Sequence, residues 1–421
     1  MLHALREMAA RGCADEFMLF TRARESAAEE ARLRASGWET QPILPPSAAR
    51  RAFAAARGVL GERAARRLAA WLRVRRHRPD APGVEAVSQR PELGRWLRRC
   101  GVQLMLYPAP TTLTFETGLP SVMAIHDLQH RLQPDFPEVS AGGEWERREH
   151  LYRNAARHAT LLLADSEVGR EDILNLYGRF GATPGRVKVL PFLPAHYLAA
   201  HVTEAERLRV RATHRLPERY FFYPAHFWPH KNHARLVRAL GLLKHERQIN
   251  AHVVFCGSHT GGVREATFAE ADSLAKSSGV ARQIHHLGYV PDADMSALYA
   301  ESSGLVMPTF FGPTNIPIVE AWAAGCPVLT SDIRGVREQA GDAALLVDPR
   351  SVESIADGLR VLWTDAGVRD ELVRCGRRRL SAYGPVEYRE RLSGIIKEAK
   401  SAARSRLAAG APRPATPERT F

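Results

Sequence analysis

The sequence predicts an α/β protein with two domains, each built around a parallel β-sheet. At 421 residues the chain is longer than one hydrophobic core usually supports, so two domains of about 200 residues each are expected. Short apolar runs alternate with amphipathic stretches throughout, which is typical of parallel strands joined by helices. Hydrophobic residues make up 45% of the chain and charged residues 25%, the proportions of a soluble globular protein. No apolar run is long enough to predict a membrane-spanning helix.

The chain opens in a helical pattern, Leu2–Arg11, and strands are expected at the apolar runs that follow. Those of the first half are Phe17–Thr21, Val102–Tyr107, Ser121–Ile125, Thr160–Ala164 and Val187–Leu190. Those of the second half are Tyr220–Tyr223, His252–Cys256, Ile284–Leu287, Gly304–Met307, Pro327–Thr330 and Ala344–Val347. Amphipathic helical stretches include Ser47–Arg76, Ala234–Lys244, Asp294–Ser302, Ile316–Ala324 and Val352–Trp363.

A polar, helix-prone stretch, Ala199–Pro217, separates the two halves and sets the expected domain boundary. The first domain is expected to cover residues 1–205 and the second residues 206–382. A helical segment at 383–406 and a disordered, proline-containing tail at 407–421 follow. A ligand-binding α/β domain normally begins with a strand and a glycine-rich turn, and neither is found before Leu2.

The net charge of +13 is concentrated in one segment, Arg50–Cys100, which holds fourteen arginines and four acidic residues. Such a segment attracts polyanions, namely nucleic acid, anionic lipid headgroups or phosphorylated lipid, although a solvated helix face explains it equally well. No helix-turn-helix, zinc or aromatic-interleaved basic motif favours nucleic acid. Five cysteines without CxxC spacing and a start without an export signal favour a reduced, cytoplasmic protein.

The segment Met307–Val328 carries the strongest chemical signal. A strand ends, a Gly/Pro/Asn turn follows, and Pro317 stands where a first-turn helix proline belongs. The amides at the open end of such a helix bind anions. Glu320, one turn further on, can accept hydrogen bonds from ligand hydroxyls, so the pair suits a nucleotide. The alternative is an ordinary helix start with a glutamate that stabilises the dipole.

Two further segments place polar side chains at strand ends. In Tyr220–His233 a strand leads through a proline-rich turn to a helix whose start is expected to be capped near Asn232. Lys231 lies in that turn, where a cation can neutralise a diphosphate. In Val122–Leu128 a strand ends in His126 and Asp127. A solvated lysine and a satisfied strand-end histidine are the alternatives for Lys231 and His126.

A metal site is not expected near Lys231. His226, His230 and His233 lie close together in the sequence, but no carboxylate follows them at ligand spacing.

These segments resemble the retaining family 4 glycosyltransferases. Met307–Asp348, with Glu-Ala-Trp-Ala-Ala-Gly-Cys-Pro-Val from Glu320, is similar to that family's donor-site signature, and Tyr223–Asn232 and Ile125–Leu128 resemble its other landmarks. The resemblance covers about Leu104–Ala382, and it is closest to members of cell-envelope polysaccharide assembly. It implies a GT-B fold: two Rossmann-like, doubly wound parallel-sheet domains that face each other across a cleft. The acceptor side comes first, the donor side second, and the last helix packs back on the first domain.

The resemblance also implies roles for individual residues. Glu320 would bind the ribose hydroxyls, Lys231 the diphosphate and His126 the donor sugar. The turn formed by Gly312, Thr314, Asn315 and Ile316 would hold phosphate and sugar, and the backbone at Tyr289 and Val290 would flank the base. His226 would share the diphosphate charge.

Three departures from the family pattern stand out. Gly312 occupies the place of a second glutamate that normally touches the sugar, and His226 occupies the place of an arginine that normally shares the diphosphate charge. The family's opening strand and Gly-rich loop, which line the cleft, are not found before Leu2. A catalytically impaired protein that binds nucleotide-sugar or glycan therefore stays open as an alternative, as does a nucleotide-sugar hydrolase or epimerase.

The resemblance implies transfer of a sugar from a nucleotide diphosphate-sugar to a glycan or lipid-linked acceptor, with retention and without a metal or other cofactor. The leaving diphosphate would take the acceptor's proton, since no carboxylate pair for a double displacement is evident. Cytoplasmic location with peripheral attachment to an anionic membrane surface, through Arg50–Cys100, is the corresponding expectation.

Overall fold

The computed structural model describes residues 1–21, 33, 38, 40–42, 89–198 and 202–408, and the chain forms two compact units. The first unit comprises Met1–Gln103, Glu116–Gly118 and Pro412–Phe421. The second comprises Leu104–Phe115 and Leu119–Ala411, and it holds both of the larger sheets. The domain boundary expected at residue 205 falls inside the second unit and stays a prediction.

The first unit begins with the expected opening helix, α1 (Leu2–Ala10). Two short strands, β1 (Leu19–Thr21) and β2 (Thr40–Pro42), pair in parallel, and the helix α4 (Pro91–Arg99) follows. The ring of Phe20 packs edge to face on Trp96 with 5.8 Å between ring centroids. The strand β2 was not predicted, because its residues Thr-Gln-Pro form no apolar run.

A four-stranded parallel sheet forms the first part of the second unit, in the order β3-β4-β5-β6. Its strands are β3 (Met105–Tyr107), β4 (Ser121–Ala124), β5 (Leu161–Ala164) and β6 (Val187–Val189). The helices associated with it are α5 (Leu113–Glu116), α6 (Gln129–Leu132), α7 (Pro137–Ser140), α8 (Glu144–His158) and α9 (Glu167–Tyr177), with the 3-10 turns η1 (Ala141–Gly143) and η2 (Gly178–Phe180). Every residue of β4 and β5 is buried, because helices and loops cover both faces of a parallel sheet.

A six-stranded parallel sheet forms the second part, in the order β12-β11-β10-β7-β8-β9. Its strands are β7 (Phe221–Pro224), β8 (Val253–Cys256), β9 (Ile284–His286), β10 (Leu305–Met307), β11 (Val328–Ser331) and β12 (Leu345–Val347). All six were predicted from the apolar runs of the second half. Phe221, Phe222 and Tyr223 of the central strand β7 are fully buried, so the core of this sheet forms around β7.

The order in which strands are added to the sheet reverses between β7 and β10, which makes this pair a topological switch point. From β7 the chain builds outward through β8 and β9, then returns to place β10 on the other side of β7. Ligands of open parallel sheets bind at the carboxyl edge of such a switch point, where the loops diverge. The loops after β7 and β10 are the two segments from which the sequence predicted a phosphate site.

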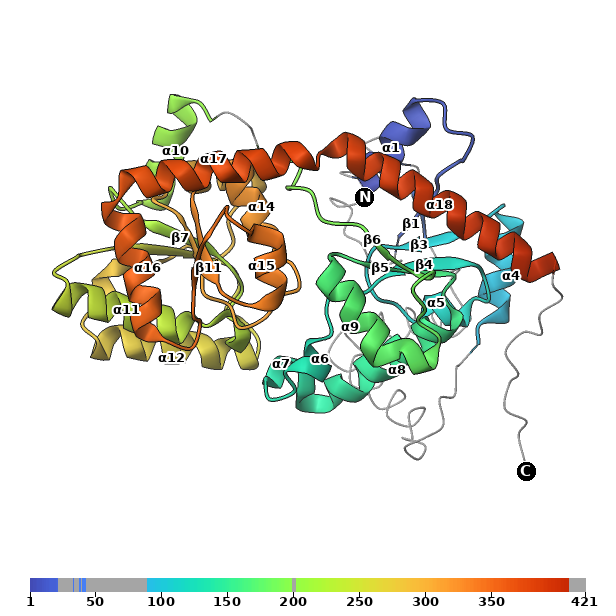
Figure 1. The fold of residues 1–421 in the computed structure, drawn as a ribbon, viewed down its shortest axis with the longest axis horizontal. Helices are drawn as coiled ribbons and strands as arrows, with labels where there is room; N and C mark the ends of the chain where they lie inside the picture. Colours follow the sequence, from blue (N-terminus) through green and yellow to red (C-terminus); the bar gives the residue numbers. More distant parts are fainter. Residues whose placement is uncertain (22–32, 34–37, 39, 43–88, 199–201, 409–421) are drawn as a thin grey trace, which may run out of the picture. The chain divides into compact units, whose positions relative to one another are not determined.

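The helices expected in this part of the chain begin within two residues of their predicted starts. The observed helices are α10 (Glu204–His214), α11 (His233–Glu246), α12 (Val263–Ser277), α13 (Asp292–Ala300), α14 (Ile316–Ala323), α15 (Arg334–Ala340), α16 (Val352–Thr364) and α17 (Ala366–Ala382), with the 3-10 turns η3 (Pro229–Lys231) and η4 (Ala281–Gln283). The helix α11 lies beside α12 and α16 (Figure 1).

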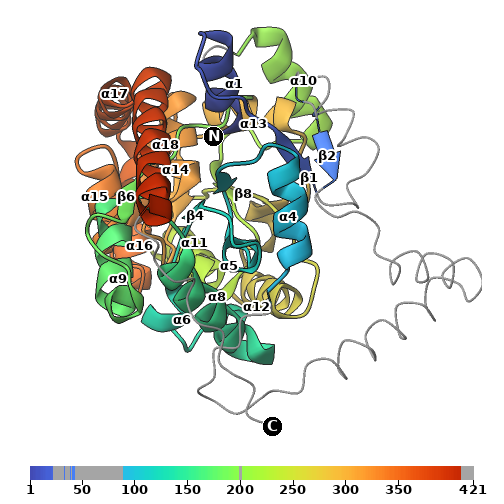
Figure 2. The same ribbon diagram turned by 90° about the vertical axis from the view of Figure 1, so that its right-hand side faces the viewer.

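The expected segment at 383–406 is the long helix α18 (Pro385–Ala408), which lies close to β6 (Figures 1 and 2). The Lys188 ammonium on β6 pairs with Glu398 on α18, and the Tyr383 hydroxyl donates to the Pro191 carbonyl at 3.3 Å. None of the helices in the described part of the chain is long and apolar enough to cross a membrane.

Several predictions fall outside the described residues. They are the helix expected at Ser47–Arg76, most of the basic segment Arg50–Cys100, and the tail from residue 409 onward.

Candidate functional site

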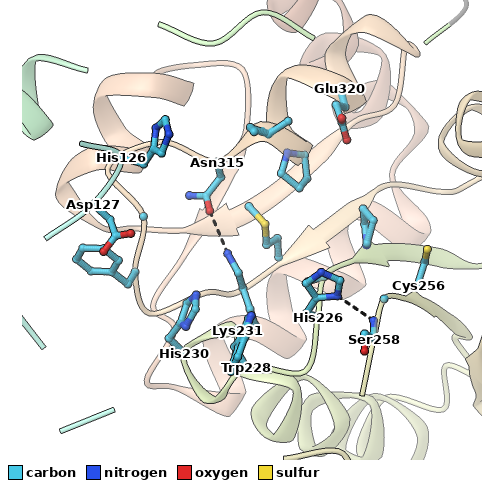
Figure 3. A pocket seen from close by; sticks show the side chains of 18 of the residues that line it. His126, Asp127, His226, Trp228, His230, Lys231, Cys256, Ser258, Asn315 and Glu320 are labelled. Carbon is cyan, nitrogen blue, oxygen red and sulfur yellow. Dashed lines mark hydrogen bonds between the residues drawn. The ribbon is translucent and has the colours of Figure 1, made fainter. Parts of the chain in front are cut away.

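A pocket of about 1140 Å³ is lined by loops that follow strands of both larger sheets (Figure 3). The four-stranded sheet contributes residues after each of its strands, and the six-stranded sheet contributes residues after β7, β8, β9 and β10. Every predicted site residue lines this one pocket: His126, His226, Lys231, Tyr289, Val290, Gly312, Thr314, Asn315, Ile316 and Glu320. Folding therefore brings residues of all three segments together with Tyr289 and Val290, which the resemblance implied.

Lys231 ends the turn η3, and its ammonium points toward Asn315 (Figure 3). The Nζ atom donates to Asn315 Oδ1 at 3.4 Å, and no carboxylate in the described part of the chain forms an ion pair with it. Burial lowers the pKa of Lys231 to about 8. A desolvated ammonium without a paired carboxylate gains most from an anionic ligand, because that ligand supplies the missing counter-charge.

The start of α14 offers two open amides to the pocket. The Asn315 N–H is not available, since it donates to Gln339 Oε1 at 2.8 Å, while the Asn315 carbonyl accepts from Gln339 Nε2 at 2.9 Å. Pro317, confirmed in the first turn, has no N–H to donate. Within the described residues, the N–H groups of Thr314 and Ile316 have no hydrogen-bond acceptor. These two amides can bind an anion at the positive end of the helix.

Gly312 lies beneath the Asn315 side chain. Its φ is +151°, a conformation that side chains rarely adopt, and a Cβ atom there would stand 2.5 Å from Asn315 Nδ2. The Asn315 amide therefore fills the space that any side chain at position 312 would need. Glycine at this position is required by the close approach of Asn315, whose Oδ1 in turn accepts from Lys231.

Glu320 lies in the second turn of α14 with its carboxylate held by two tyrosines. Its Oε2 accepts from the buried Tyr299 hydroxyl at 2.8 Å, and its Oε1 accepts a weaker bond from Tyr197 at 3.4 Å. Burial raises the pKa of Glu320, and the negative charge of Asp292 adds to this. Tyr299 thus fixes one oxygen firmly and leaves the other able to exchange Tyr197 for a ligand hydroxyl.

His226 is held as a neutral hydrogen-bond donor. Its Nδ1 accepts from the Ser258 N–H at 2.8 Å, which places the ring proton on Nε2 (Figure 3). Burial lowers the pKa of His226, and the positive charges of Arg264 and Lys231 lower it further. The residue can donate a hydrogen bond to an anion but adds no positive charge of its own.

His126 has both ring nitrogens bound to oxygen acceptors of the protein. Nδ1 lies 3.0 Å from Asp165 Oδ2, and Nε2 lies 2.7 Å from the Pro108 carbonyl oxygen. Burial alone would lower the pKa of His126, but the hydrogen bond and charge of Asp165 outweigh it and raise the pKa. Because both acceptors need a proton, the doubly protonated imidazolium satisfies this geometry.

His230 and His233 have different surroundings. His230 lines the pocket and donates from Nδ1 to Glu138 Oε1 at 2.6 Å. His233 is fully buried and stacks on Phe227 and Tyr223, with ring centroids 4.2 Å and 4.9 Å apart. Burial lowers its pKa to about 3. In the described part of the chain, His, Cys, Asp and Glu side chains form no group of three placed to hold a metal ion.

Asn232 stands at the predicted N-cap position, but its side chain does not cap the helix. Asn232 precedes α11, but its φ is +61° and its side chain makes no bond to the first-turn amides. Its Nδ2 instead donates to the carbonyls of Pro308 and Pro349, at 2.8 Å each. The side chain joins the ends of β10 and β12, and this tertiary use replaces local capping.

Comparison with known proteins finds a family model that matches part of the chain. Residues 204–379 match the Glycosyl transferases group 1 family. The O-antigen chain mannosyltransferase B of Escherichia coli is 27% identical over 237 residues, which are 56% of this chain and 59% of that protein. The chain thus spans about three fifths of the length of that relative.

Solved structures show the same fold as the matched region and the sheet before it. A glycosyltransferase from Rickettsia africae has a TM-score of 0.66 at 12% identity and covers 94% of this chain and 93% of its own. Anabaena Alr3699/HepE in complex with UDP and glucose has a TM-score of 0.63 at 15% identity, covering 89% and 90%. The predicted GT-B fold, with two Rossmann-like parallel sheets, is confirmed.

Several residues that shape the pocket were missed by sequence reasoning. Glu138 holds His230, Gln339 holds Asn315, and Asp165 holds His126. Tyr197 and Tyr299 bind Glu320. None carries a local signal, because each reaches its partner through the fold. Only Asp165 stands in a recognisable place, directly after the apolar strand Leu161–Ala164.

Proposed function

We propose that this protein is a retaining glycosyltransferase that uses a nucleotide diphosphate-sugar as donor. One observation carries the proposal: the Lys231 ammonium lies 3.4 Å from Asn315 Oδ1, at the start of the helix that bears Glu320. A cation and two open amides thus face the pocket from one side, with a carboxylate one turn away. This combination suits a diphosphate followed by a ribose.

The donor would lie along the loops of the six-stranded sheet. The diphosphate would bind between Lys231 and the amides of Thr314 and Ile316, with a further hydrogen bond from His226 Nε2. The ribose hydroxyls would bind Glu320 in place of Tyr197, and the base would lie beside the backbone of Tyr289 and Val290. The sugar would extend toward His126.

The reaction would need no protein nucleophile. The acceptor oxygen would form a bond to the anomeric carbon on the face from which the diphosphate leaves. The bond between that carbon and the diphosphate oxygen would break, and the acceptor's proton would pass to the leaving oxygen. Lys231 and the open amides would stabilise the negative charge that develops on the diphosphate, and this would account for most of the rate enhancement. Attack on the leaving-group face gives retention of configuration.

One relative favours a glycan acceptor. The name of the Escherichia coli mannosyltransferase refers to the O-antigen chain, which makes assembly of a surface polysaccharide our proposal for this chain. The basic segment Arg50–Cys100 would then dock on an anionic membrane that carries a lipid-linked acceptor. Flotation with neutral and anionic liposomes tests the docking, which predicts binding to the anionic vesicles alone.

A two-stage assay tests the function itself. Thermal shift over a panel of nucleoside diphosphates and their sugars identifies the donor, since a ligand that binds the folded state raises its stability. The products formed from that donor, with and without glycan acceptors, are then identified. Sugar transfer with retention supports the proposal. Donor consumption that is independent of acceptor would instead indicate a hydrolase or epimerase, and tight binding without turnover would indicate a binding protein.

A further inference from the structure

The turn that presents Lys231 is fastened to the other sheet's side of the pocket by one carboxylate. Glu138, on the short helix α7 after β4, places its Oε1 between two donors of His230. The His230 N–H donates to it at 3.1 Å and the ring Nδ1 at 2.6 Å. Since His230 directly precedes Lys231, these bonds fix the backbone from which the ammonium extends.

The six-stranded sheet holds the same turn from the opposite side. The His230 carbonyl accepts from the Phe310 N–H at 2.7 Å and from Thr309 Oγ1 at 3.1 Å, and the Lys231 carbonyl accepts from the Tyr223 hydroxyl at 2.7 Å. Glu138 supplies the contact from the four-stranded side. Two more contacts bring its segment close: Gln133 Nε2 donates to the Phe310 carbonyl at 2.9 Å, and the Phe136 ring packs on Phe310 at 5.9 Å.

The charge of Glu138 also acts on Lys231. Its second oxygen, Oε2, is buried and has no hydrogen-bond partner among the described residues. Burial lowers the pKa of Lys231, while the carboxylates of Asp127 and Glu138 raise it again. A hydrogen-bonded His230 lowers the pKa of Glu138 despite its burial, so the carboxylate stays charged at neutral pH.

Three histidines also lie near Lys231. Burial lowers the pKa of His226, His230 and His233, and the charge of Lys231 lowers all three further. All three are therefore neutral near pH 8, where Lys231 titrates. The Asp127 carboxylate is paired with the Arg148 guanidinium at 2.8 Å, whereas the partner of Glu138, His230, is neutral.

We propose that Glu138 is a positioning residue for Lys231: it anchors the turn Pro229–Lys231 through His230 and supplies a carboxylate that acts on the ammonium. The catalytic consequence rests on the proposed function, in which Lys231 binds the donor diphosphate. The placement of Lys231 then depends on a residue from the acceptor side of the pocket. A donor-site cation would be fully formed only when the segment that carries Glu138 is in place.

Trace acetylation with acetic anhydride measures the effect of Glu138 on the pKa of Lys231 without any substrate. The full-length protein is labelled between pH 6.5 and 10, and modification of the Lys231 peptide is followed by mass spectrometry to give the pKa of that lysine. Wild type is expected to titrate at about 8. In Glu138→Gln the amide oxygen still accepts from His230 but the charge is gone, so the pKa should fall by about one unit. Glu353→Gln, the same change at an exposed site on α16, should leave it unchanged.

The pH dependence of kcat/KM then shows whether the labelling pKa of Lys231 governs the reaction. The alkaline limb of kcat/KM should move to lower pH in Glu138→Gln by the same amount as the labelling pKa. Glu138→Ala, which also removes the acceptor for His230, should weaken nucleoside diphosphate binding more than Glu138→Gln does. A labelling pKa that is the same in wild type and Glu138→Gln, or that moves equally in Glu353→Gln, overturns the inference. Absence of sugar transfer by the wild type overturns the proposed function and leaves the labelling result to decide on Glu138.

Discussion

The Nζ atom of Lys231 lies 3.4 Å from Oδ1 of Asn315, so the loops after β7 and β10 meet across the switch point of the six-stranded sheet. The side chains come from turns that are separated in sequence but leave adjacent strands at the same edge. The contact is long for a hydrogen bond between an ammonium and an amide oxygen, and no carboxylate of the described residues pairs with Lys231. An anionic ligand would supply the counter-charge that this cation needs.

Replacing Lys231 should lower the transfer activity and raise the stability of the protein. Lys231→Met removes the cation from the diphosphate site, and sugar transfer should fall at least about 100-fold. It also removes a half-buried, unpaired charge, so the free energy of unfolding of the ligand-free protein at pH 7 should rise by about 1–3 kcal/mol. Urea unfolding measures this, and Lys276→Met on the exposed face of α12 is the control.

The extra stability of Lys231→Met over wild type should depend on pH in a defined way. The pKa of Lys231 is about 8 in the folded protein, below the ordinary value of 10.5, so between these values the unfolded chain binds more protons. The stability of the wild type should therefore rise with pH across this window relative to Lys231→Met. The advantage of the variant should be complete below pH 8 and should disappear as pH approaches 10.5. A variant that is less stable than wild type at pH 7 would contradict this account of the lysine.

Glu320 should recognise ribose hydroxyls. Glu320→Gln should weaken nucleoside diphosphate binding by about tenfold, because a charged acceptor is replaced by a neutral one. The 2′-deoxy and 3′-deoxy analogues identify the contact: the loss of the contacted hydroxyl should matter in wild type and much less in Glu320→Gln. Equal losses in both proteins, measured by calorimetric titration, would mean that Glu320 does not bind the ribose.

Gly312 should tolerate no side chain. Gly312→Ala would force its Cβ against the Asn315 amide, displace Oδ1 from Lys231, and lower both stability and nucleotide affinity, the former by about 1–2 kcal/mol. Gly312→Glu should behave no better, because its carboxylate has no room while Asn315 is present. Gly142→Ala separates the effect of backbone strain from that of the contact with Asn315. Gly142 also has a positive φ, of +64°, but an added Cβ there would meet no atom within 4 Å. A Gly312→Ala protein with wild-type nucleotide affinity would show that the Asn315 contact is dispensable.

His126 should carry a proton above its ordinary range. Selective ¹³C labelling of histidine and NMR titration should give a pKa above 6.5 for His126 in wild type. Asp165→Asn removes the carboxylate that raises it, so the pKa of His126 should then fall, as burial alone dictates. His196, for which no ion pair is present in the described part of the chain, provides a reference signal in the same spectra. An unchanged His126 titration in Asp165→Asn would show that the pair does not control the proton.

Local sequence patterns predicted the strands and helix starts around the pocket, but not the residues that hydrogen-bond to the site side chains. Each strand of the six-stranded sheet is a short apolar run bounded by turn residues, so its existence and its carboxyl end could be read directly, as at Tyr220–Tyr223. Pro317 likewise marks the first turn of α14 because a proline there needs no N–H partner. Lys231 and Glu320 could be placed because they follow such ends at once.

These hydrogen-bonding residues could not be predicted because their partners are distant in sequence. Glu138 lies 92 positions from His230, Asp165 lies 39 from His126 and Gln339 lies 24 from Asn315. Periodicity gives no information on such pairs. Asn232 shows the same effect in reverse: its sequence position indicates a helix cap, but carbonyls at the ends of two strands compete successfully for its side chain.

Calorimetric titration of wild type and Lys231→Met with the preferred nucleoside diphosphate tests the claim that Lys231 binds the donor diphosphate. If the ammonium and the start of α14 hold the diphosphate together, wild type binds the ligand and the Kd of the variant is at least about tenfold weaker, with the folded state retained. Equal affinity in the two proteins, or a wild type that binds no nucleoside diphosphate at millimolar concentration, would contradict the claim.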